Sequence, residues 1–561
     1  MNKVNPFFML KSGTKQLKSL YMKIKKITLL QVFLLLTSYL LNAQYNFEMI
    51  KDINPNGDSN PDKFTYFNNK LIFTADDGVH GREPWISDGT NAGTFLLKDI
   101  NPNGGSDIYN AWFVVYNGKA YFGANDGSST NLWVTDGTPA GTVLFNNLNS
   151  NLKEHYIFNG LLYFEAQNGT SGSELWVTNG TTAGTQLVKD IEPNGDSSPF
   201  GFVELNGNLY FFARNPQNGR RSLWITDGTA TGTVLVNTAV DNSSSEPVLY
   251  NGKFYFSSYS STTGYELWSS DGTTNGTQLV KDINPGVIGS SISDFKVFNN
   301  RLFFSANDGN VGKELWVTDG TTNGTVLFHN FLSPGDGNPT ELTVLGNLMF
   351  MKADGVSVGE ELFATTGNTG TNNTYLVKDI AQFSANSRPF YLNVYNNELF
   401  FIASDNPSGS SIIFDLWVSN GTQQGTIKIA PPIAPNIAPL IENQRNFTVV
   451  NNSLFFTASF TSNGNELWKL TAANLSTSQF NSENEIKVYP NPTSNVVNIK
   501  YPNDFKGNYT LYDKTGKLIY KNNINALENQ FTLENYASGL YLLVIANDNG
   551  REIFSYKIVK K

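Results

Sequence analysis

The feature that most constrains this chain is a segment of twelve residues that recurs along most of its length. It reads "ELWVTDGTTNGT" from Glu314, "ELWSSDGTTNGT" from Glu266 and "ELWVTNGTTAGT" from Glu174. Its aromatic residue recurs at steps of 43 to 54 residues. The aligned aromatic positions are Trp85, Trp133, Trp176, Trp224, Trp268, Trp316, Phe363, Trp417 and Trp468. Nine copies of one unit predict a repeat architecture, in which neighbouring units bury each other's apolar surface.

Each copy contains four strand signals. In the copy around Trp316 they are "FKVFNN", "RLFFSA", "KELWVTD" and "GTVLFHN", which are rich in aromatic and β-branched residues. Asn-Gly or Asn-Asn pairs join the first two segments and supply the positive φ of a tight hairpin. The unit is therefore predicted to be a four-stranded antiparallel meander of about 47 residues.

The predicted strands are apolar on both faces. In "ELWVT", Leu315 and Val317 point to one face and Trp316 to the other. A two-layer sandwich would leave one face polar, whereas sheets stacked face to face around an axis are covered on both sides. The expected fold class is all-β, with a β-propeller of about nine four-stranded repeats.

The two ends of the repeat array complement each other. The segment "YNFEMIKDINPNGDS" from Tyr45 resembles a fourth strand, while the array stops at Leu470 after a third strand. The first segment can therefore complete the last sheet and leave no open edge. We expect residues 44–470 to form one ring. A right-handed open superhelix and two smaller rings are the alternatives.

The charge and composition exclude several classes of function. Residues 44–485 contain 22 basic and 42 acidic residues, so this part repels phosphate backbones and no nucleic-acid partner is expected. The chain has no Cys, which excludes disulfides and thiolate chemistry. His80, His155 and His329 share no spacing, so neither a metal nor another cofactor is expected.

The N-terminus has the layout of a secretory signal peptide. A basic stretch from Met22 precedes the mostly apolar run Ile27–Leu41, and Ala43 precedes a cleavage site that makes Gln44 the new N-terminus. The apolar run is shorter than a membrane-spanning helix needs. Residues 1–43 are interpreted as an extension plus signal peptide, with translation starting at the first residue or at Met22. No transmembrane segment is expected in the mature protein.

The acidic residues of the repeated segment have two interpretations. Glu314 and Asp319 could be a carboxylate pair for acid–base catalysis. Alternatively, Asp319 accepts a backbone hydrogen bond and Gly320 adopts positive φ, which is turn chemistry. Nine catalytic sites in one ring are implausible, so we favour turns and expect no catalytic residues. The corresponding pairs elsewhere are Glu266/Asp271, Glu174/Asn179, Asn131/Asp136, Ser222/Asp227 and Asp415/Asn420.

A second motif resembles the first half of a calcium loop. "DINPNGD" begins at Asp52, "DINPNGG" at Asp99 and "DIEPNGD" at Asp190. The bidentate Glu of the complete loop is missing in all three copies. The residues at that position are Lys63, Asn110 and Gly201. A Pro-Asn-Gly turn is therefore favoured over a metal site.

Three arginines gather in the loop "ARNPQNGRRSLW". Arg214, Arg220 and Arg221 could hold an anionic sugar, although such a loop is more often simply solvated. The sequence favours the solvated loop.

The repeat makes the chain resemble the bacterial "ELWxxDGT" repeat proteins, whose defining string is the one quoted above. The resemblance covers residues 45–470. It implies a secreted repeat protein and brings no established activity. The copies depart from the string at Glu83-Pro84-Trp85 and at Phe363, in "ELFATTGNTGTNNT".

The last part of the chain shares nothing with the repeats. Residues 471–485 are polar and are interpreted as a linker. Residues 486–561 contain short strand signals and turns, which predict a small β-sandwich. They resemble the type A C-terminal sorting domain of the Bacteroidetes type IX secretion system. The resemblance rests on Val488–Pro492, "LYDKTGKLI", "GLYLLV" and the final "KIVKK".

The sorting-domain resemblance implies a route and a set of partners. The chain would be exported by the Sec machinery, cross the outer membrane through the type IX translocon, and meet a surface sortase. The predicted location is therefore extracellular or on the outer cell surface. The expected function is a non-enzymatic binding or adhesion scaffold for a glycan or protein ligand. A polysaccharide-active enzyme with its site on the propeller face, or a purely structural surface component, are the alternatives.

Overall fold

The computed structural model describes residues 45–108, 112–241, 246–370, 373–407, 412–429, 447–472, 486–501, 506–513, 517–524, 528–547 and 552–561. The predicted signal peptide, its cleavage site at Ala43 and Gln44, and nearly all of the predicted linker lie outside these residues. The chain divides into two compact units, Met1–Ala473 and Asn474–Lys561.

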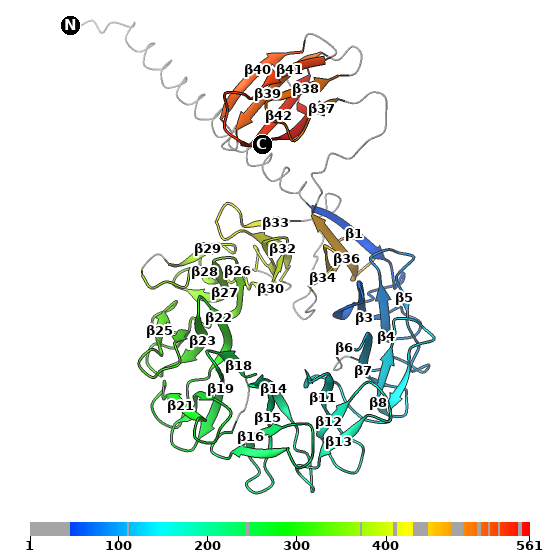
Figure 1. Ribbon diagram of the computed structural model, residues 1–561, viewed down its shortest axis with the longest axis vertical. Coiled ribbons are helices and arrows are strands. Elements are labelled where there is room, and N and C mark those ends of the chain that lie inside the picture. Colours follow the sequence, from blue (N-terminus) through cyan, green and yellow to red (C-terminus); the bar gives the residue numbers. More distant parts are fainter. Residues whose placement is uncertain are drawn as a thin grey trace, which may run out of the picture. The chain divides into compact units, whose positions relative to one another are not determined.

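Within the described residues, the first unit contains nine four-stranded antiparallel sheets, here called blades 1 to 9 (Figure 1). Blade 1 comprises β2 (Asp62–Phe67), β3 (Lys70–Asp76), β4 (Arg82–Ser87) and β5 (Phe95–Leu96). Blade 2 comprises β6 (Val114–Tyr116), β7 (Lys119–Asn125), β8 (Thr130–Thr135) and β9 (Val143–Asn146). Blade 3 comprises β10 (His155–Phe158), β11 (Leu161–Ala166), β12 (Glu174–Thr178) and β13 (Gln186–Lys189).

The next three blades repeat the same order of strands. Blade 4 comprises β14 (Phe200–Leu205), β15 (Asn208–Arg214), β16 (Arg221–Thr226) and β17 (Val234–Asn237). Blade 5 comprises β18 (Val248–Tyr250), β19 (Lys253–Ser260), β20 (Gly264–Ser270) and β21 (Gln278–Lys281). Blade 6 comprises β22 (Ser293–Phe298), β23 (Arg301–Asn307), β24 (Lys313–Thr318) and β25 (Val326–His329).

The last three blades include the one that joins the two ends of the array. Blade 7 comprises β26 (Thr340–Leu345), β27 (Leu348–Gly355), β28 (Gly359–Thr365) and β29 (Thr374–Lys378). Blade 8 comprises β30 (Phe390–Tyr395), β31 (Glu398–Ala403), β32 (Asp415–Ser419) and β33 (Ile427–Ile429). Blade 9 comprises β34 (Thr448–Val450), β35 (Ser453–Ala458), β36 (Glu466–Ala472) and, from the other end, β1 (Tyr45–Lys51).

The blades form a closed ring. A buried apolar cluster lies between each pair of consecutive blades, and the cluster of Leu467 and Phe73 joins blade 9 back to blade 1. The alternation in the repeated segment serves this stacking: Trp316 packs toward blade 5, whereas Leu315 and Val317 pack toward blade 7. The predicted β-propeller is confirmed, and within the described residues it is a single ring of nine blades (Figure 1).

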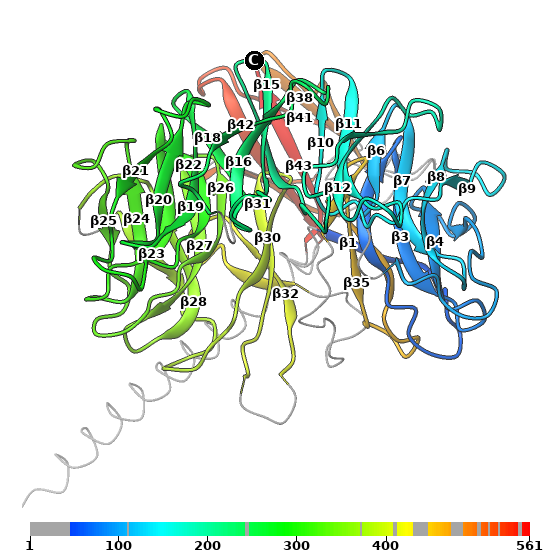
Figure 2. The same cartoon turned by 90° about the horizontal axis from the view of Figure 1, so that it is seen from below.

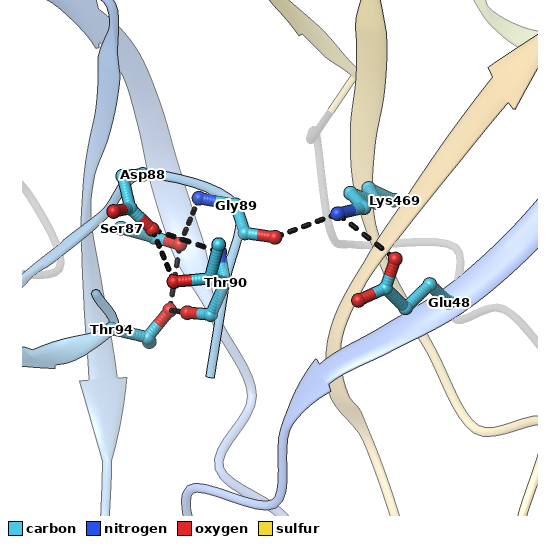
Figure 3. Close-up of polar contacts among 7 residues, drawn as sticks. All are labelled: Glu48, Ser87, Asp88, Gly89, Thr90, Thr94 and Lys469. Atoms are coloured by element: carbon cyan, nitrogen blue, oxygen red, sulfur yellow. Dashed lines mark hydrogen bonds and ion pairs between the residues drawn. The ribbon is translucent and has the colours of Figure 1, made fainter. Parts of the chain in front are cut away.

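Strand β1 closes the ring. It pairs antiparallel with β36, placing Tyr45 opposite Ala472 and Phe47 opposite Leu470. Strand β36 thus extends past the predicted end of the array at Leu470. Lys469 Nζ lies 2.9 Å from Glu48 Oε2 and also donates to the carbonyl oxygen of Gly89 in blade 1 at 2.7 Å (Figure 3).

Each blade presents two kinds of connection. The first strands lie nearest the ring axis and the fourth strands lie at the rim (Figure 1). Because the blades are meanders, the 1–2 hairpin and the 3–4 turn are at one end of a blade. The 2–3 loop and the link to the next blade are at the other end, as the edge-on view shows (Figure 2).

The second unit consists of two sheets around one core. One sheet has the order β37 (Lys487–Tyr489), β38 (Val496–Lys500), β41 (Glu528–Thr532). The other has the order β40 (Leu518–Asn523), β39 (Gly507–Asp513), β42 (Gly539–Asn547), β43 (Glu552–Lys560). Val497 and Phe531 of the first sheet pack with Leu511 and Leu543 of the second. This is the predicted small β-sandwich.

Candidate functional site

The glutamate that opens the repeated segment is buried and binds the loop after the fourth strand of its blade. In blade 5, Glu266 accepts hydrogen bonds from the N–H groups of Ile283 at 2.8 Å and Asn284 at 3.1 Å. Ser290 Oγ donates a third bond at 2.8 Å. A buried carboxylate surrounded by donors fixes the backbone of that loop. The equivalent glutamates with the same role are Glu83, Glu174, Glu314, Glu361 and Glu466.

Burial changes the ionisation of these carboxyl groups. It raises the pKa of four of them to about 7, and the hydrogen bonds from the loop oppose that shift. The four are Glu83, Glu266, Glu361 and Glu466.

The DGT part of the segment is a turn held by its own side chains (Figure 3). In blade 1, Asp88 Oδ1 accepts hydrogen bonds from Thr90 N at 2.9 Å and Thr90 Oγ1 at 2.7 Å. Ser87 Oγ accepts from Gly89 N at 3.0 Å. Thr94 Oγ1 donates to the carbonyl oxygen of Thr90 at 2.7 Å. The short polar side chains therefore replace backbone bonds that the tight turn cannot make.

The glycine of the DGT turn is also a contact between blades. Gly320 has φ of +95°, and a Cβ at this position would lie 2.4 Å from the Tyr255 hydroxyl of blade 5. Gly228 of blade 4 has the same relation to Tyr163 of blade 3, also at 2.4 Å. The glycine of the repeated segment therefore has two roles. It allows the positive φ of the turn, and it leaves room for close packing against the neighbouring blade.

The proposed carboxylate pair consists of two residues with separate structural partners. Glu314 is fully buried and accepts from Phe331 N at 2.8 Å. Asp319 is exposed and accepts from Thr321 N at 2.9 Å. Asp319 thus holds a turn, whereas Glu314 lies in strand β24 and binds the loop that follows the fourth strand.

The "DINPNGD" motifs form turns. Gly57 N donates to the carbonyl oxygen of Asn54 at 3.0 Å, and the copies at Asp99 and Asp190 make the same bond. Asp58 Oδ1 accepts from Asn465 N at 2.8 Å, so this acid fixes the start of a third strand. Among the residues that the structure describes, no group of three or more His, Asp or Glu residues is placed to hold a metal ion. Of the three positions that replace the bidentate Glu, Lys63 and Gly201 lie in first strands and Asn110 lies outside the described residues.

The three arginines singled out in the sequence line a pocket of about 290 Å³. The pocket opens between blades 4 and 5, at the ends of the blades that carry the 2–3 loops. Its lining residues are Ser197, Ser198, Arg214, Gly219, Arg220, Arg221, Asp241 and Tyr265. The structure therefore brings Arg214, Arg220 and Arg221 together with residues of both blades, and the three arginines are exposed, as the solvated-loop interpretation expects.

Aromatic rings support two of these arginines. The Arg221 guanidinium lies 4.8 Å from the ring centroid of Phe200, and that of Arg220 lies 5.7 Å from the ring centroid of Tyr259. Within the part of the chain that the structure describes, none of the three guanidinium groups forms an ion pair. The acid of the pocket, Asp241, lies close to Arg220 and Arg221. Its pKa is raised by burial, and the two nearby arginines oppose the rise.

The pocket coincides with a departure of blade 4 from the repeat. Ser222 occupies the position of the buried glutamate, and its Oγ is buried without a hydrogen-bond partner among the described residues. The segment after β17 reads "TAVD" in place of the "DINPNGD" pattern. Blade 4 has therefore lost the glutamate–loop contact at the edge of the pocket.

A second feature, exposed in six of the nine described blades, was not recognised in the sequence. It concerns the next-to-last residue of the first strand of each blade. This residue pairs with the second residue of the second strand in all described blades, and it is apolar in eight of the nine. The nine residues are Tyr66, Val115, Ile157, Glu204, Leu249, Val297, Val344, Val394 and Val449. In the sequence this position recurs once per blade, but it can be aligned between blades only when the ends of the strands are known.

Comparisons with known proteins give weak structural likenesses. No curated protein matches the chain. The computationally designed Ika8 protein is 15% identical, with a TM-score of 0.35, and the match covers 68% of this chain and 98% of that one. Puromycin hydrolase is 11% identical, with a TM-score of 0.34, over 74% of this chain and 60% of that enzyme. A Mycobacterium tuberculosis puromycin-hydrolyzing peptidase is 9% identical, with a TM-score of 0.34, over 73% of this chain and 59% of that one.

The C-terminal unit has a specific match. Residues 487–561 match the family model of the secretion system C-terminal sorting domain. This confirms the predicted sorting domain and indicates export to the cell surface or extracellular space, through contact with the type IX machinery. No helix in the described residues is both long and apolar enough to cross a membrane.

Proposed function

We propose that this chain is a non-enzymatic binding scaffold that acts outside the cell. The observation that carries the proposal is the contrast between the two sets of charged residues in the propeller. The carboxylates of the repeat are bound to turns and loops, as Glu314 and Asp319 illustrate. The pocket of Arg214, Arg220 and Arg221 is exposed, is not repeated, and has no ion pair among the described residues.

The proposal includes the repeat family. The string "ELWxxDGT" and its nine-fold recurrence support membership in the bacterial ELWxxDGT-repeat proteins. In a ring whose blades share buried clusters on both sides, loops at the blade ends are presented on a rigid support. Such a surface suits binding or adhesion, for which no reacting group is needed.

The N-terminal part of the proposal is a Sec signal peptide. The side chain of Tyr45, the second residue after the predicted cleavage site, is 3% exposed and packs in the cluster between blades 8 and 9. A mature N-terminus at Gln44 would therefore leave the closing strand intact. N-terminal sequencing of the secreted protein should give Gln44, and a mature protein that begins after Tyr45 would contradict this assignment.

The function itself can be tested with the mature chain, residues 44–561. We expect it to bind at least one polysaccharide or surface protein on an array and to release no product from the same polymers. Hydrolysis of any polymer, abolished by a single carboxylate substitution in the propeller, would show that the chain is an enzyme instead.

A further inference from the structure

We propose that the pocket formed by Arg214, Arg220, Arg221 and Tyr265 binds an acidic sugar residue of an extracellular polysaccharide through its carboxylate or sulfate group. This inference rests on the proposed binding function and names its ligand class and site. It is carried by the arginine content, the strand pairing, the aromatic rings and the charge of the surrounding surface.

The pocket concentrates arginine in a chain that uses it rarely. The whole sequence contains eight Arg, and three of them lie within residues 214–221. Arginine presents a planar fork of donors that matches the two oxygens of a carboxylate or sulfate, which the ammonium group of lysine cannot do. Three such forks around one cavity favour an oxyanion as the ligand.

The pairing of strands β15 and β16 places two positive charges opposite each other, which is unfavourable for folding. Arg214 at the end of β15 lies directly opposite Arg221 at the start of β16. In blade 1 the same position holds Asp76 opposite Arg82, which are complementary charges. Like charges on directly opposite residues are destabilising, and a local conflict of this kind is typical of a functional site. Asp241, which lines the same pocket and interacts with Arg220 and Arg221, offsets part of this positive charge, and a bound anion would offset more of it.

Aromatic contacts hold the arginines and provide a face for a sugar ring. Phe200 lies beneath Arg221 and Tyr259 beneath Arg220, which limits the freedom of both guanidinium groups before a ligand arrives. Tyr265 lines the pocket, and its ring centroid lies 5.1 Å from that of Tyr259. A cavity of about 290 Å³ has room for one sugar ring, and the chain can continue into solvent.

The acidic surface of the propeller favours polymers of low charge density over densely charged ones. The propeller carries many more acidic than basic residues, so it repels a densely charged polyanion at long range. A polymer with isolated acidic sugars reaches the pocket with less repulsion. We therefore expect stronger binding of a sparsely carboxylated polysaccharide than of heparin at low ionic strength.

The test uses the mature chain, residues 44–561, in calorimetric titrations with partly methyl-esterified polygalacturonate, its fully esterified form, a sulfated galactan, heparin and poly-glutamate. The test variant is Arg220→Gln with Arg221→Gln, both at exposed positions. The control is Arg301→Gln, another arginine that lies over an aromatic ring, Phe303 in blade 6. We expect the double variant to bind the acidic polysaccharide at least tenfold more weakly, with a melting temperature no lower than that of the parent chain because the Arg214–Arg221 repulsion is removed, and the control to bind like the parent chain.

Each other outcome has a defined meaning. Preference for the galactan over the polygalacturonate would identify the anion as sulfate, and the reverse would identify carboxylate, and both support the pocket. The pocket assignment would be overturned if the double variant bound as tightly as the parent chain, or if the parent chain bound the fully esterified polymer as tightly as the partly esterified one. Either result would leave a binding function elsewhere on the ring. Preference for poly-glutamate would assign the pocket to a protein ligand and overturn the sugar. If the parent chain bound none of the five polymers, the sugar assignment would fall, and the array experiment would decide the proposed function separately.

Discussion

At the scale of single residues, the buried glutamates connect the sequence repeat to the pH dependence of stability. Glu266 and Glu466 each bind the loop that follows a fourth strand, and burial raises the pKa of both to about 7. The turn aspartates behave in the opposite way, because hydrogen bonds from Thr321 lower the pKa of Asp319. Two sets of carboxyl groups in one segment therefore respond to pH with opposite signs.

We predict that the propeller is most stable at mildly acidic pH, near pH 4 to 5. Between the ordinary Glu pKa of 4.5 and about 7, the folded chain retains protons on Glu83, Glu266, Glu361 and Glu466 that the unfolded chain releases, so stability falls as pH rises. Below the ordinary Asp pKa of 3.8, protonation of Asp319 and its equivalents removes their turn bonds and stability falls again.

Melting temperatures measured from about pH 3 to about pH 8 should be highest near about pH 4 to 5. The variant Glu266→Gln with Glu361→Gln removes two of the titrating groups, so its decline toward neutral pH should be shallower. A melting temperature that rose steadily up to pH 7 in the parent chain would contradict the assignment.

The DGT glycine allows a matched pair of substitutions. Gly320→Asn places a Cβ against the Tyr255 hydroxyl, and we expect it to lower the free energy of unfolding by about 2–4 kcal/mol. Gly252→Asn also changes a glycine of positive φ, but nothing lies within 4 Å of its Cβ, and Asn300 occupies the same hairpin position in blade 6. That control should change stability by less than about 0.5 kcal/mol. Equal effects in urea denaturation would show that the blade contact is unimportant.

At the scale of elements, the strands are joined into a ring by contacts that cross from blade to blade. Lys189 at the end of β13 donates to the carbonyl oxygen of Thr233 in blade 4 at 2.7 Å, and Lys281 does the same to Thr325 in blade 6 at 2.9 Å. At the junction of the chain ends, Lys51 of β1 donates to Thr94 of blade 1 at 2.7 Å. The closing strand is thus bound both to its own sheet and to the next one.

We predict that deletion of Tyr45–Ile53 destabilises the ring or causes aggregation. Blade 9 would then expose the edge of β36, and the buried side chains of Tyr45 and Ile50 would be lost at about 1.5–3 kcal/mol each. Size-exclusion chromatography and thermal melting would measure the effect.

The control for this deletion is addition of a synthetic peptide of residues 45–53. Because the missing strand only has to pair with β36, the peptide should raise the melting temperature of the deleted chain. A deleted chain that stays monomeric with unchanged stability would mean that β1 is not needed for closure.

At the scale of the whole molecule, the chain combines a propeller with a sorting domain. Each unit has its own core, and the nine blade clusters share no residue with the cluster of Val497, Leu511 and Leu543. We predict that residues 44–473 fold without the second unit and keep the binding of the mature chain. Loss of the melting transition or of binding in that fragment would contradict the independence of the units.

The sorting domain should be sufficient for export. Residues 471–561 placed behind a signal peptide and a fluorescent reporter should send the reporter to the cell surface or medium of a host with type IX secretion. In a mutant of that host without the outer-membrane translocon, the reporter should remain in the periplasm with its tail uncut. Equal export by the mutant would show that the tail is not a type IX signal.

The sequence by itself determined the class of the fold, because that information is local and periodic. The period of Trp85 and its equivalents defined the blades, the alternation in "ELWVT" defined two buried faces, and the phase shift between Tyr45 and Leu470 predicted closure. The sorting domain was recognisable for the same reason, since its motifs are contiguous in the chain.

The tertiary structure alone decided how residues from different blades meet. Arg220 in blade 4 and Tyr265 in blade 5 are far apart in sequence, and only the stacking of the two blades places them in one pocket. The role of Glu466 depended on a loop at the opposite end of the chain, which it binds at Ile53. Local patterns record which face of a strand is buried, but contacts between blades depend on a stacking that no short stretch of sequence encodes.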